Sequence, residues 1–294
     1  MKLALIGVGL IGGSFAAALR AAGVVGEVIG YDPDPRAVAL AAERDIITRS
    51  APSSAEAVRG TDLVVIATPV GATRASLAAI ADALMPNAIV TDVGSTKASV
   101  IDDARAALGS RLQRFVPAHP IAGGERPGVE HADAALFRGR LVITTPTPQT
   151  DAEALSTVEA LWRSAGARVE RLDAAIHDEV FAAVSHLPHV LAFTLVEMIA
   201  AGEDAAMKFA HAGAGFHDFT RIAASSPQMW RDVCLANRTA LAAELRRYRA
   251  RLESLQHAID TSNGAELERV FGVAAAARRN GDSAKAEDQL IRPD

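Results

Sequence analysis

The sequence contains very little cysteine, which limits both its chemistry and the compartment it fits. Cys234 is the only cysteine among 294 residues, so no disulfide can form within the chain. Nothing therefore points to an oxidising compartment, where many small proteins depend on disulfides. Aromatic residues are also scarce, at 4%, whereas alanine is abundant, and this composition favours closely packed helices.

Long apolar runs and concentrated basic charge are absent as well. No stretch reaches the ~18 apolar residues that a membrane-spanning helix requires. The apolar N-terminus could pass for a signal peptide, but Lys2 is its only basic residue and its glycines would break an apolar helix. The net charge is −5 and the basic residues are dispersed, so there is no electrostatic footprint for nucleic acid. We expect a cytoplasmic protein that binds neither membranes nor nucleic acid.

Short β-branched runs alternate with longer Ala- and Leu-rich helical patterns up to residue 171. Several of these runs are continuously apolar, as expected for strands covered by helices on both faces. The alternation indicates βαβ units and a mostly parallel sheet. The expected strands are Leu3–Ile6, Val28–Tyr31, Leu63–Ala67, Ala88–Thr91, Arg114–Ala118, Leu141–Thr144 and Ala167–Arg171. The expected helices are Gly12–Ala22, Arg36–Glu43, Thr73–Leu84, Ser99–Leu108 and Asp151–Ala165.

After Leu172 the strand patterns vanish and helical patterns take over. The expected helices here are Ala174–Ser185, Val190–Ala201, a short one near Asp204–Ala210, Pro227–His257 and Gly264–Arg279. Residues 280–294 are polar and lack periodicity, which predicts a flexible tail. We therefore predict two domains, an α/β domain over residues 1–171 and an all-α domain over residues 172–294.

A glycine motif follows the first expected strand and opens the first expected helix. In this GxGxxG motif Gly7 permits a tight turn, Gly9 lets a pyrophosphate approach the backbone and Gly12 allows close helix–strand packing. The helix N-terminus offers free N–H groups to phosphates. Asp32 ends the second strand, where its carboxylate would bind ribose hydroxyls and repel a 2′-phosphate. The motif predicts a Rossmann-type domain that binds NAD through Gly7, Gly9, Leu10, Ile11, Gly12 and Asp32.

Polar residues follow three later strands, at the edge where parallel sheets bind their ligands. Thr68 and Pro69 follow the third strand and either line the nicotinamide side of the site or form a turn. Ser95 follows the fourth strand and either faces the ligand or caps the next helix. His119 follows the fifth strand, where a histidine can act as a general base near neutral pH.

Two further polar clusters lie in the helical half. His186 and His189 flank Leu187-Pro188, but no HExxH motif or obvious third ligand accompanies them, so we expect no metal site. Arg221 stands among Phe and Ile residues, and a buried arginine requires a partner. Either Asp218 pairs with it, or Arg221 binds an anionic substrate with its bidentate fork.

As an ordered set, these motifs resemble the prephenate/arogenate dehydrogenase family over residues 2–260. The segments that carry the resemblance are GVGLIGGS, TDVGSTK, HPIAG, SHLPH, and GFHDFTRIA followed by SPQMW. The resemblance implies an NAD-dependent oxidoreductase of tyrosine biosynthesis. Such enzymes, also called cyclohexadienyl dehydrogenases, oxidatively decarboxylate prephenate to 4-hydroxyphenylpyruvate or arogenate to tyrosine.

The resemblance also implies roles for individual residues. His119 takes the proton of the ring hydroxyl, and Ser95 orients His119 and contacts the same hydroxyl. Arg221 binds a substrate carboxylate, with His189 near the side-chain end of the substrate. Because His119 is then the general base, we expect activity to fall on acidification through a pKa near ~6.5.

Further expectations from the resemblance concern gating, assembly and control. Glu125 and Asp218 are implied as acidic partners that hold or release Arg221, and the helical domain is implied to form a homodimer. Ala214 stands where the family pattern has a third glycine. From a length of 294 residues we expect neither a fused chorismate mutase nor an ACT domain. If tyrosine inhibits the enzyme, we therefore expect it to compete at the active site.

Three alternatives stay open at this point. Prephenate carries a keto group where arogenate carries an amine, and His189 could serve either side chain. A 3-hydroxy acid dehydrogenase would use a lysine in the helical domain, yet Lys208 is the only lysine there before the tail and lies outside any comparable motif. A module that binds NAD without chemistry would not need His119, Ser95 and Arg221 together.

Overall fold

The computed structural model describes residues 1–124, 126 and 128–291, with side chains described through Gly281. The chain forms two compact units, Met1–Leu241 and Ala242–Asp294. The boundary predicted at residues 171 and 172 lies inside the first unit, and a division into domains there stays a prediction.

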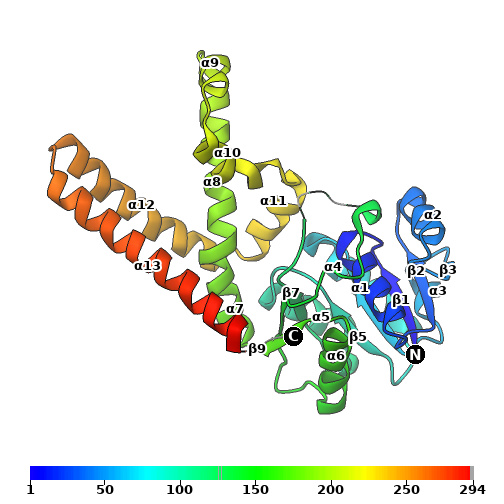
Figure 1. Ribbon diagram of the computed structural model, residues 1–294. Helices are drawn as coiled ribbons and strands as arrows, with labels where there is room; N and C mark the ends of the chain where they lie inside the picture. Colours follow the sequence, from blue (N-terminus) through cyan, green and yellow to red (C-terminus); the bar gives the residue numbers. More distant parts are fainter. Residues whose placement is uncertain (125, 127, 292–294) are drawn as a thin grey trace. The chain divides into compact units, whose positions relative to one another are not determined.

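A six-stranded parallel sheet forms the centre of the N-terminal half of the first unit (Figure 1). Its order is β3-β2-β1-β4-β5-β6, which is the strand order of the Rossmann fold. Strands β4 and β5 are buried along their whole length, as their continuous apolar runs predict. The strands are β1 (Lys2–Ile6), β2 (Glu27–Tyr31), β3 (Arg49–Ser50), β4 (Leu63–Ile66), β5 (Ile89–Asp92) and β6 (Phe115–Val116). The predicted fold of the N-terminal half is confirmed.

Helices cover both faces of this sheet, and each face has its own apolar core. On one face Phe15 of α1 stacks on Trp162 of α6, with ring centroids 3.8 Å apart. On the other face Leu77 of α4 and Val100 of α5 pack with the apolar side chains of the strands. Asp151 caps α6 by accepting a hydrogen bond from the Ala154 N–H. These helices are α1 (Leu10–Ala21), α2 (Pro35–Glu43), α3 (Ser54–Val58), α4 (Thr73–Ile80), α5 (Ala98–Leu108) and α6 (Ala152–Ser164).

The expected strand Arg114–Ala118 is divided between two sheets, and this changes the setting of His119. β6 ends at Val116, whereas β7 (Ala118–Pro120) pairs antiparallel with β8 (Leu141–Thr144), which pairs parallel with β9 (Arg168–Arg171). Pro117 separates β6 from β7, and proline has no N–H to donate to a sheet. His119 therefore lies within a strand of the second sheet rather than after a strand of the first.

The helical part of the first unit begins with a continuous helical run where two separate helices were expected. α7 (Ala174–Phe181) passes through a π-helical turn at Ala182–His186 into α8 (Leu187–Ala200). Pro188 lacks the N–H that a regular helix needs, and a π turn can absorb such a defect. α9 (Ala205–Ala210), α10 (Ala214–Thr220), a 3₁₀ turn (Arg221–Ala224) and α11 (Pro227–Ala236) follow.

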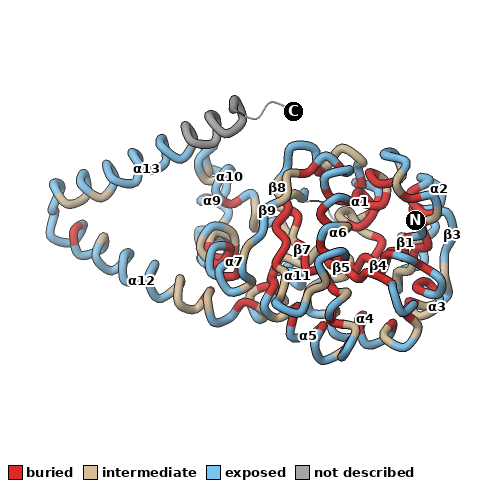
Figure 2. The backbone as a smooth tube through the Cα atoms, turned by 90° about the horizontal axis from the view of Figure 1, so that it is seen from below, coloured by how far each residue is buried: buried red, intermediate tan, exposed pale blue. Residues whose placement is uncertain are grey.

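A break at Asn237 divides the long helix expected over Pro227–His257. The Asn237 side chain donates to the Asp178 carbonyl oxygen at 2.7 Å and lies 3.1 Å from His186 Nδ1, so tertiary contacts fix the break. α12 (Arg238–Asp260) follows and runs into the second unit, where α13 (Gly264–Ile291) is the last helix of the described residues. These two helices diverge from the turn between them (Figure 2). α13 extends beyond the expected end at Arg279, so residues 280–291, expected to belong to a flexible tail, are helical.

Large apolar side chains that remain exposed are concentrated after residue 172. Among the described residues before that point, only Met1 and Met85 belong to this group. The run Ala174–Ala200 contains an 18-residue window with a mean hydropathy of 1.5, so it is long and apolar enough to cross a membrane by length and composition alone. The apolar side of a helix that packs on a second protein chain has the same features, so this measure does not separate the two cases.

Candidate active site

The glycine loop between β1 and α1 has the geometry of a dinucleotide site. Gly7 has a φ of +94°, and a Cβ there would lie 2.6 Å from the Ala67 carbonyl carbon. A Cβ on Gly12 would lie 2.6 Å from the Ala67 Cβ, whereas a Cβ on Gly9 would meet nothing within 4 Å. The backbone is thus packed tightly on the inside of the loop and open at Gly9, where a pyrophosphate would approach.

The start of α1 and Asp32 complete this loop. α1 begins at Leu10 and Ile11 without a side-chain cap, so the N–H groups of its first turn remain available to an anion. Asp32 Oδ2 accepts from the Val8 N–H at 2.8 Å, and Oδ1 accepts from the Asp34 N–H at 2.9 Å. Each carboxylate oxygen keeps a further lone pair that can accept from a ribose hydroxyl. These residues fit an NAD molecule.

Thr68 and Pro69 follow β4, which neighbours β1 in the sheet. Thr68 is half-buried, with its hydroxyl 3.3 Å from that of Ser76, and Pro69 is exposed at the start of a 3₁₀ turn. A Cβ on Gly71 in this turn would lie 2.6 Å from Asp232 Oδ2 of α11. The helical part of the unit therefore contacts the loop that carries Thr68 and Pro69.

We expect the Asp32→Ser variant to lower the preference for NAD over NADP by about 10- to 100-fold, because charge-assisted hydrogen bonds contribute about 1.5–3 kcal/mol each. The measurement is kcat/KM for each cofactor at a fixed substrate concentration. Asp32→Asn is the matched control for charge, since it keeps the side-chain length and one acceptor oxygen. An unaltered preference in both variants would assign Asp32 to loop structure alone.

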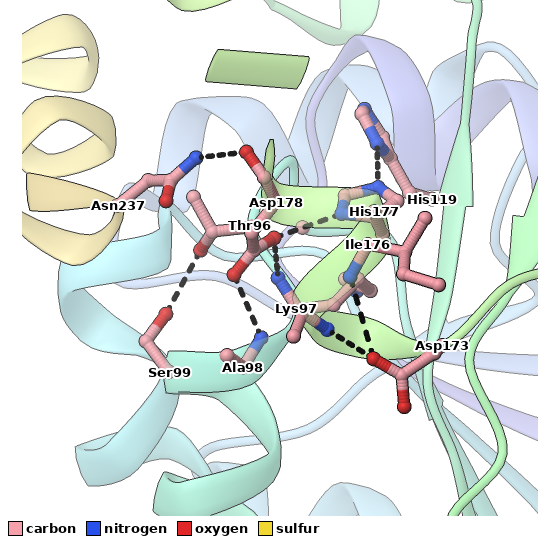
Figure 3. Close-up of polar contacts among 12 residues, drawn as sticks. Thr96, Lys97, Ala98, Ser99, His119, Asp173, Ile176, His177, Asp178 and Asn237 are labelled. Carbon is pink, nitrogen blue, oxygen red and sulfur yellow. Dashed lines mark hydrogen bonds and ion pairs between the residues drawn. The ribbon is translucent and has the colours of Figure 1, made fainter. Parts of the chain in front are cut away.

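His119 is the first member of a chain of three hydrogen-bonded side chains (Figure 3). Its Nδ1 lies 2.8 Å from His177 Nε2, and His177 Nδ1 lies 2.8 Å from Asp178 Oδ1. His177 and Asp178 are both buried and come from α7. The ring of Phe181, one helical turn further, lies 4.8 Å from that of His119 and 4.5 Å from that of His177. Neither His177 nor Asp178 belongs to any of the motifs that the sequence predicts to form the site.

Asp178 also binds the N-terminus of α5. Its Oδ1 accepts from the Lys97 N–H at 2.8 Å and its Oδ2 accepts from the Ala98 N–H at 3.0 Å. Burial raises the pKa of Asp178, but hydrogen bonds from His177 and from these two amides outweigh burial and hold this pKa below its usual value. Asp178 is therefore a buried carboxylate that joins α7 to α5.

A buried ion pair holds the main chain immediately before His119. Lys97 Nζ lies 2.5 Å from Asp92 Oδ2 and donates to the Ala118 carbonyl oxygen at 2.7 Å. The Ala118 N–H in turn donates to Asp92 Oδ1 at 3.1 Å. The side chains of Lys97 and Asp92 are 0% and 3% exposed. Since Asp92 is the last residue of β5, this pair ties β7 to the carboxyl end of the parallel sheet.

Burial, with further repulsion from His177, Lys97 and His186, holds the pKa of His119 well below its usual value of 6.5. Protonation removes the lone pair that a base needs, so a lower pKa moves the loss of activity to lower pH. We therefore expect kcat/KM to stay high through pH 6.5 and to fall only at more acidic pH, which corrects the expectation of a pKa near 6.5. A profile with its midpoint at 6.5 would contradict this lowering of the His119 pKa.

Ser95 and His189, two further residues predicted to form the site, are both partly buried. Ser95 is half-buried in the loop between β5 and α5, and within the described structure no hydrogen bond joins it to His119. His189 Nδ1 lies 2.9 Å from the Ser185 carbonyl oxygen, and its ring stacks on Trp230 with centroids 3.6 Å apart. Burial lowers the pKa of His189.

Asp218 in α10 and Arg221 in the 3₁₀ turn are both exposed. The apolar neighbours of Arg221 in sequence suggested that it is buried, but Phe219 is itself exposed. Because Arg221 is exposed, the requirement that a buried arginine have a partner does not apply to it. Glu125 lies outside the described residues. The part of the chain that the structure describes contains no group of three His, Cys, Asp or Glu residues that could hold a metal ion.

Comparisons with known proteins agree with this geometry. Residues 15–171 match the family described as "Prephenate dehydrogenase, nucleotide-binding domain", and residues 173–273 match "Prephenate dehydrogenase, dimerization domain". A cyclohexadienyl dehydrogenase of Zymomonas mobilis is 36% identical over 99% of this chain and 98% of its own length.

Solved structures give the same result. The prephenate dehydrogenase of Aquifex aeolicus in complex with hydroxyphenyl propionate and NAD⁺ has a TM-score of 0.89 and 36% identity, covering 95% of this chain and 98% of that one. An arogenate dehydrogenase of Synechocystis has a TM-score of 0.78 and 28% identity, covering 97% and 100%. The chain belongs to the prephenate dehydrogenase family of NAD-dependent oxidoreductases.

Proposed function

We propose that the protein oxidatively decarboxylates prephenate to 4-hydroxyphenylpyruvate, with NAD as the oxidant, on the way to tyrosine. The observation that carries the proposal is the position of His119. Its strand is bound to Asp92 at the carboxyl end of β5, the edge of the sheet that faces ligands in this fold. One ring nitrogen of His119 contacts His177, which leaves the other for the substrate.

In the proposed reaction His119 accepts the proton of the ring hydroxyl as the carbon that bears it is oxidised. NAD, when bound, supplies the hydride acceptor, held by the loop from Gly7 to Gly12 and by Asp32. Carbon dioxide leaves as the ring becomes aromatic, which provides the driving force. We assign to Ser95 a contact with the same hydroxyl and to Arg221 the binding of a substrate carboxylate.

We favour prephenate as the substrate and keep arogenate as the alternative. This chain is similar both to a prephenate dehydrogenase and to an arogenate dehydrogenase. The two substrates share the reacting ring and differ only in the side chain, for which His189 is the proposed contact. Dual specificity, as the name cyclohexadienyl dehydrogenase implies for the Zymomonas relative, is the third outcome.

The test is NADH formation by the purified protein with prephenate and with arogenate, each in the presence of NAD or NADP. Reduction of NAD by prephenate supports the proposal, and the ratio of the two kcat/KM values gives the specificity. If NAD binds but neither substrate reduces it, the substrate assignment is wrong while the dinucleotide site stands.

The proposal includes a homodimer formed through the helical part, in the cytoplasm. A second copy would cover the exposed apolar side chains of α8, such as Met198, and of later helices, such as Phe271. Analytical ultracentrifugation tests this, and a monomer at micromolar concentration would contradict it. If tyrosine inhibits, we expect inhibition to be competitive with prephenate, and a noncompetitive pattern would contradict that part.

A further inference from the structure

We infer that His177 and Asp178 are positioning residues that fix the tautomer of His119, keeping its Nε2 free of hydrogen and its Nδ1 protonated. The inference rests on the proposed function, because it concerns the group assigned as the base. It follows from assigning donors and acceptors along the hydrogen-bonded chain, starting from its buried end (Figure 3).

The direction of the chain is set at Asp178. Both of its carboxylate oxygens accept main-chain N–H groups, from Lys97 at 2.8 Å and from Ala98 at 3.0 Å. A main-chain N–H can only donate, so neither oxygen is placed to carry a proton of its own. Asp178 Oδ1, which lies 2.8 Å from His177 Nδ1, must therefore accept there too. His177 Nδ1 carries the hydrogen.

The hydrogen on His177 Nδ1 in turn determines the tautomer of His119. Burial keeps the pKa of His177 below its usual value, so the ring is neutral near pH 7, and with hydrogen on Nδ1 its Nε2 holds a lone pair. His119 Nδ1 lies 2.8 Å from this nitrogen, and two lone pairs at that distance would repel each other. His119 must donate from Nδ1. Because His119 is also neutral, its Nε2 is the unprotonated nitrogen, which is the one that can accept a substrate proton.

The surroundings protect this arrangement from exchange with water. His177 is 0% exposed and Asp178 is 5% exposed. The ring of Phe181 lies against both histidines, and Asn237 at the end of α11 donates to the Asp178 carbonyl oxygen at 2.7 Å. When His119 takes a proton, the hydrogen bond from its Nδ1–H to His177 can become stronger. The Asp178 carboxylate, which is the next group in the hydrogen-bonded chain, then stabilises the positive charge. This is the role that a carboxylate plays behind the histidine of a serine protease triad.

The experiment compares two substitutions of nearly equal size. His177→Gln keeps a side-chain acceptor for the His119 Nδ1–H and a donor for Asp178, whereas His177→Met has similar length and no comparable acceptor. Both leave Asp178 and its contacts with α5 in place. ¹⁵N NMR of histidine-labelled protein reports which ring nitrogens carry hydrogen, and the His119→Asn spectrum identifies the signals of His119.

We expect wild-type protein and His177→Gln to show an unprotonated Nε2 on His119, and His177→Met to show a mixture of tautomers. We expect kcat to fall about 10- to 100-fold in His177→Met and less than about 10-fold in His177→Gln, since orientation accounts for part of the benefit of a base. A wild-type His119 protonated on Nε2, or the same tautomer in all three proteins, would overturn the inference. If the wild-type protein oxidises neither prephenate nor arogenate, the proposed function falls, while the tautomer measurement needs no substrate and still decides the inference.

Discussion

The His119→Asn variant should turn over prephenate roughly 10²–10⁴-fold more slowly than the wild-type protein, because that is the usual contribution of a positioned acid–base group. Asparagine is polar and can still donate to His177, but its amide cannot accept a proton near neutral pH. The loss should appear in kcat, measured as NADH formation at saturating prephenate and NAD. The acidic fall in the pH profile of the wild-type protein should disappear in the variant.

The control for this prediction is His257→Asn, which changes an exposed histidine at the end of α12. We expect that variant to match the wild-type protein. The dissociation constant for NAD should be unchanged in His119→Asn, since His119 lies outside the loop from Gly7 to Gly12. Wild-type turnover in a folded His119→Asn variant would remove His119 from the mechanism.

The cofactor half of the site could be predicted from the sequence because its determinants are local. The turn at Gly7, the open backbone at Gly9 and the packing of Gly12 all depend on glycines within one strand–turn–helix unit. Asp32 directly follows the neighbouring strand β2, and in a parallel sheet neighbouring strands end at the same edge. The predicted strands up to Ala88–Thr91 each agree within one residue at either end with β1, β2, β4 and β5, for the same reason. β3 was missed, since two exposed residues, Arg49 and Ser50, carry no apolar pattern.

The support for His119 could not be predicted because it depends on contacts between distant segments. His177 and Asp178 are separated from His119 by more than fifty residues and form no motif with it. One local pattern was available in the sequence. Asp173 is a good N-cap for a helix beginning at Ala174, and in such a helix His177 and Phe181, four residues apart, lie on the same face. That pattern predicts a buried histidine, but only the tertiary fold identifies its partner. The exposure of Arg221 was likewise hidden, because neighbours in sequence do not determine burial.

The Lys97→Met variant should lower the melting temperature by roughly 6–20 °C. Removing one partner of a buried ion pair costs about 3–5 kcal/mol, and each kcal/mol shifts the midpoint by about 2–4 °C in a protein of this size class. Methionine fills similar volume, so the loss reflects charge rather than a cavity. Asp92 would keep the hydrogen bonds that it accepts from the Gly94 and Ala118 N–H groups but would lose the cation paired with it. The Ala118 carbonyl oxygen would lose the hydrogen bond that it accepts from Lys97. Thermal unfolding followed by circular dichroism measures the effect.

A second substitution separates the structural role of Lys97 from a role at the substrate. The Lys97→Met/Asp92→Asn double variant has no unpaired buried carboxylate at position 92. The amide oxygen of the new side chain can still accept a hydrogen bond from the Ala118 N–H. We therefore expect the double variant to regain part of the lost melting temperature. Activity should recover in parallel, because Ala118 carries the main chain into His119. If instead Lys97→Met melts like the wild-type protein and loses activity, the ammonium acts on a ligand, and the buried pair is not what holds β7 to β5.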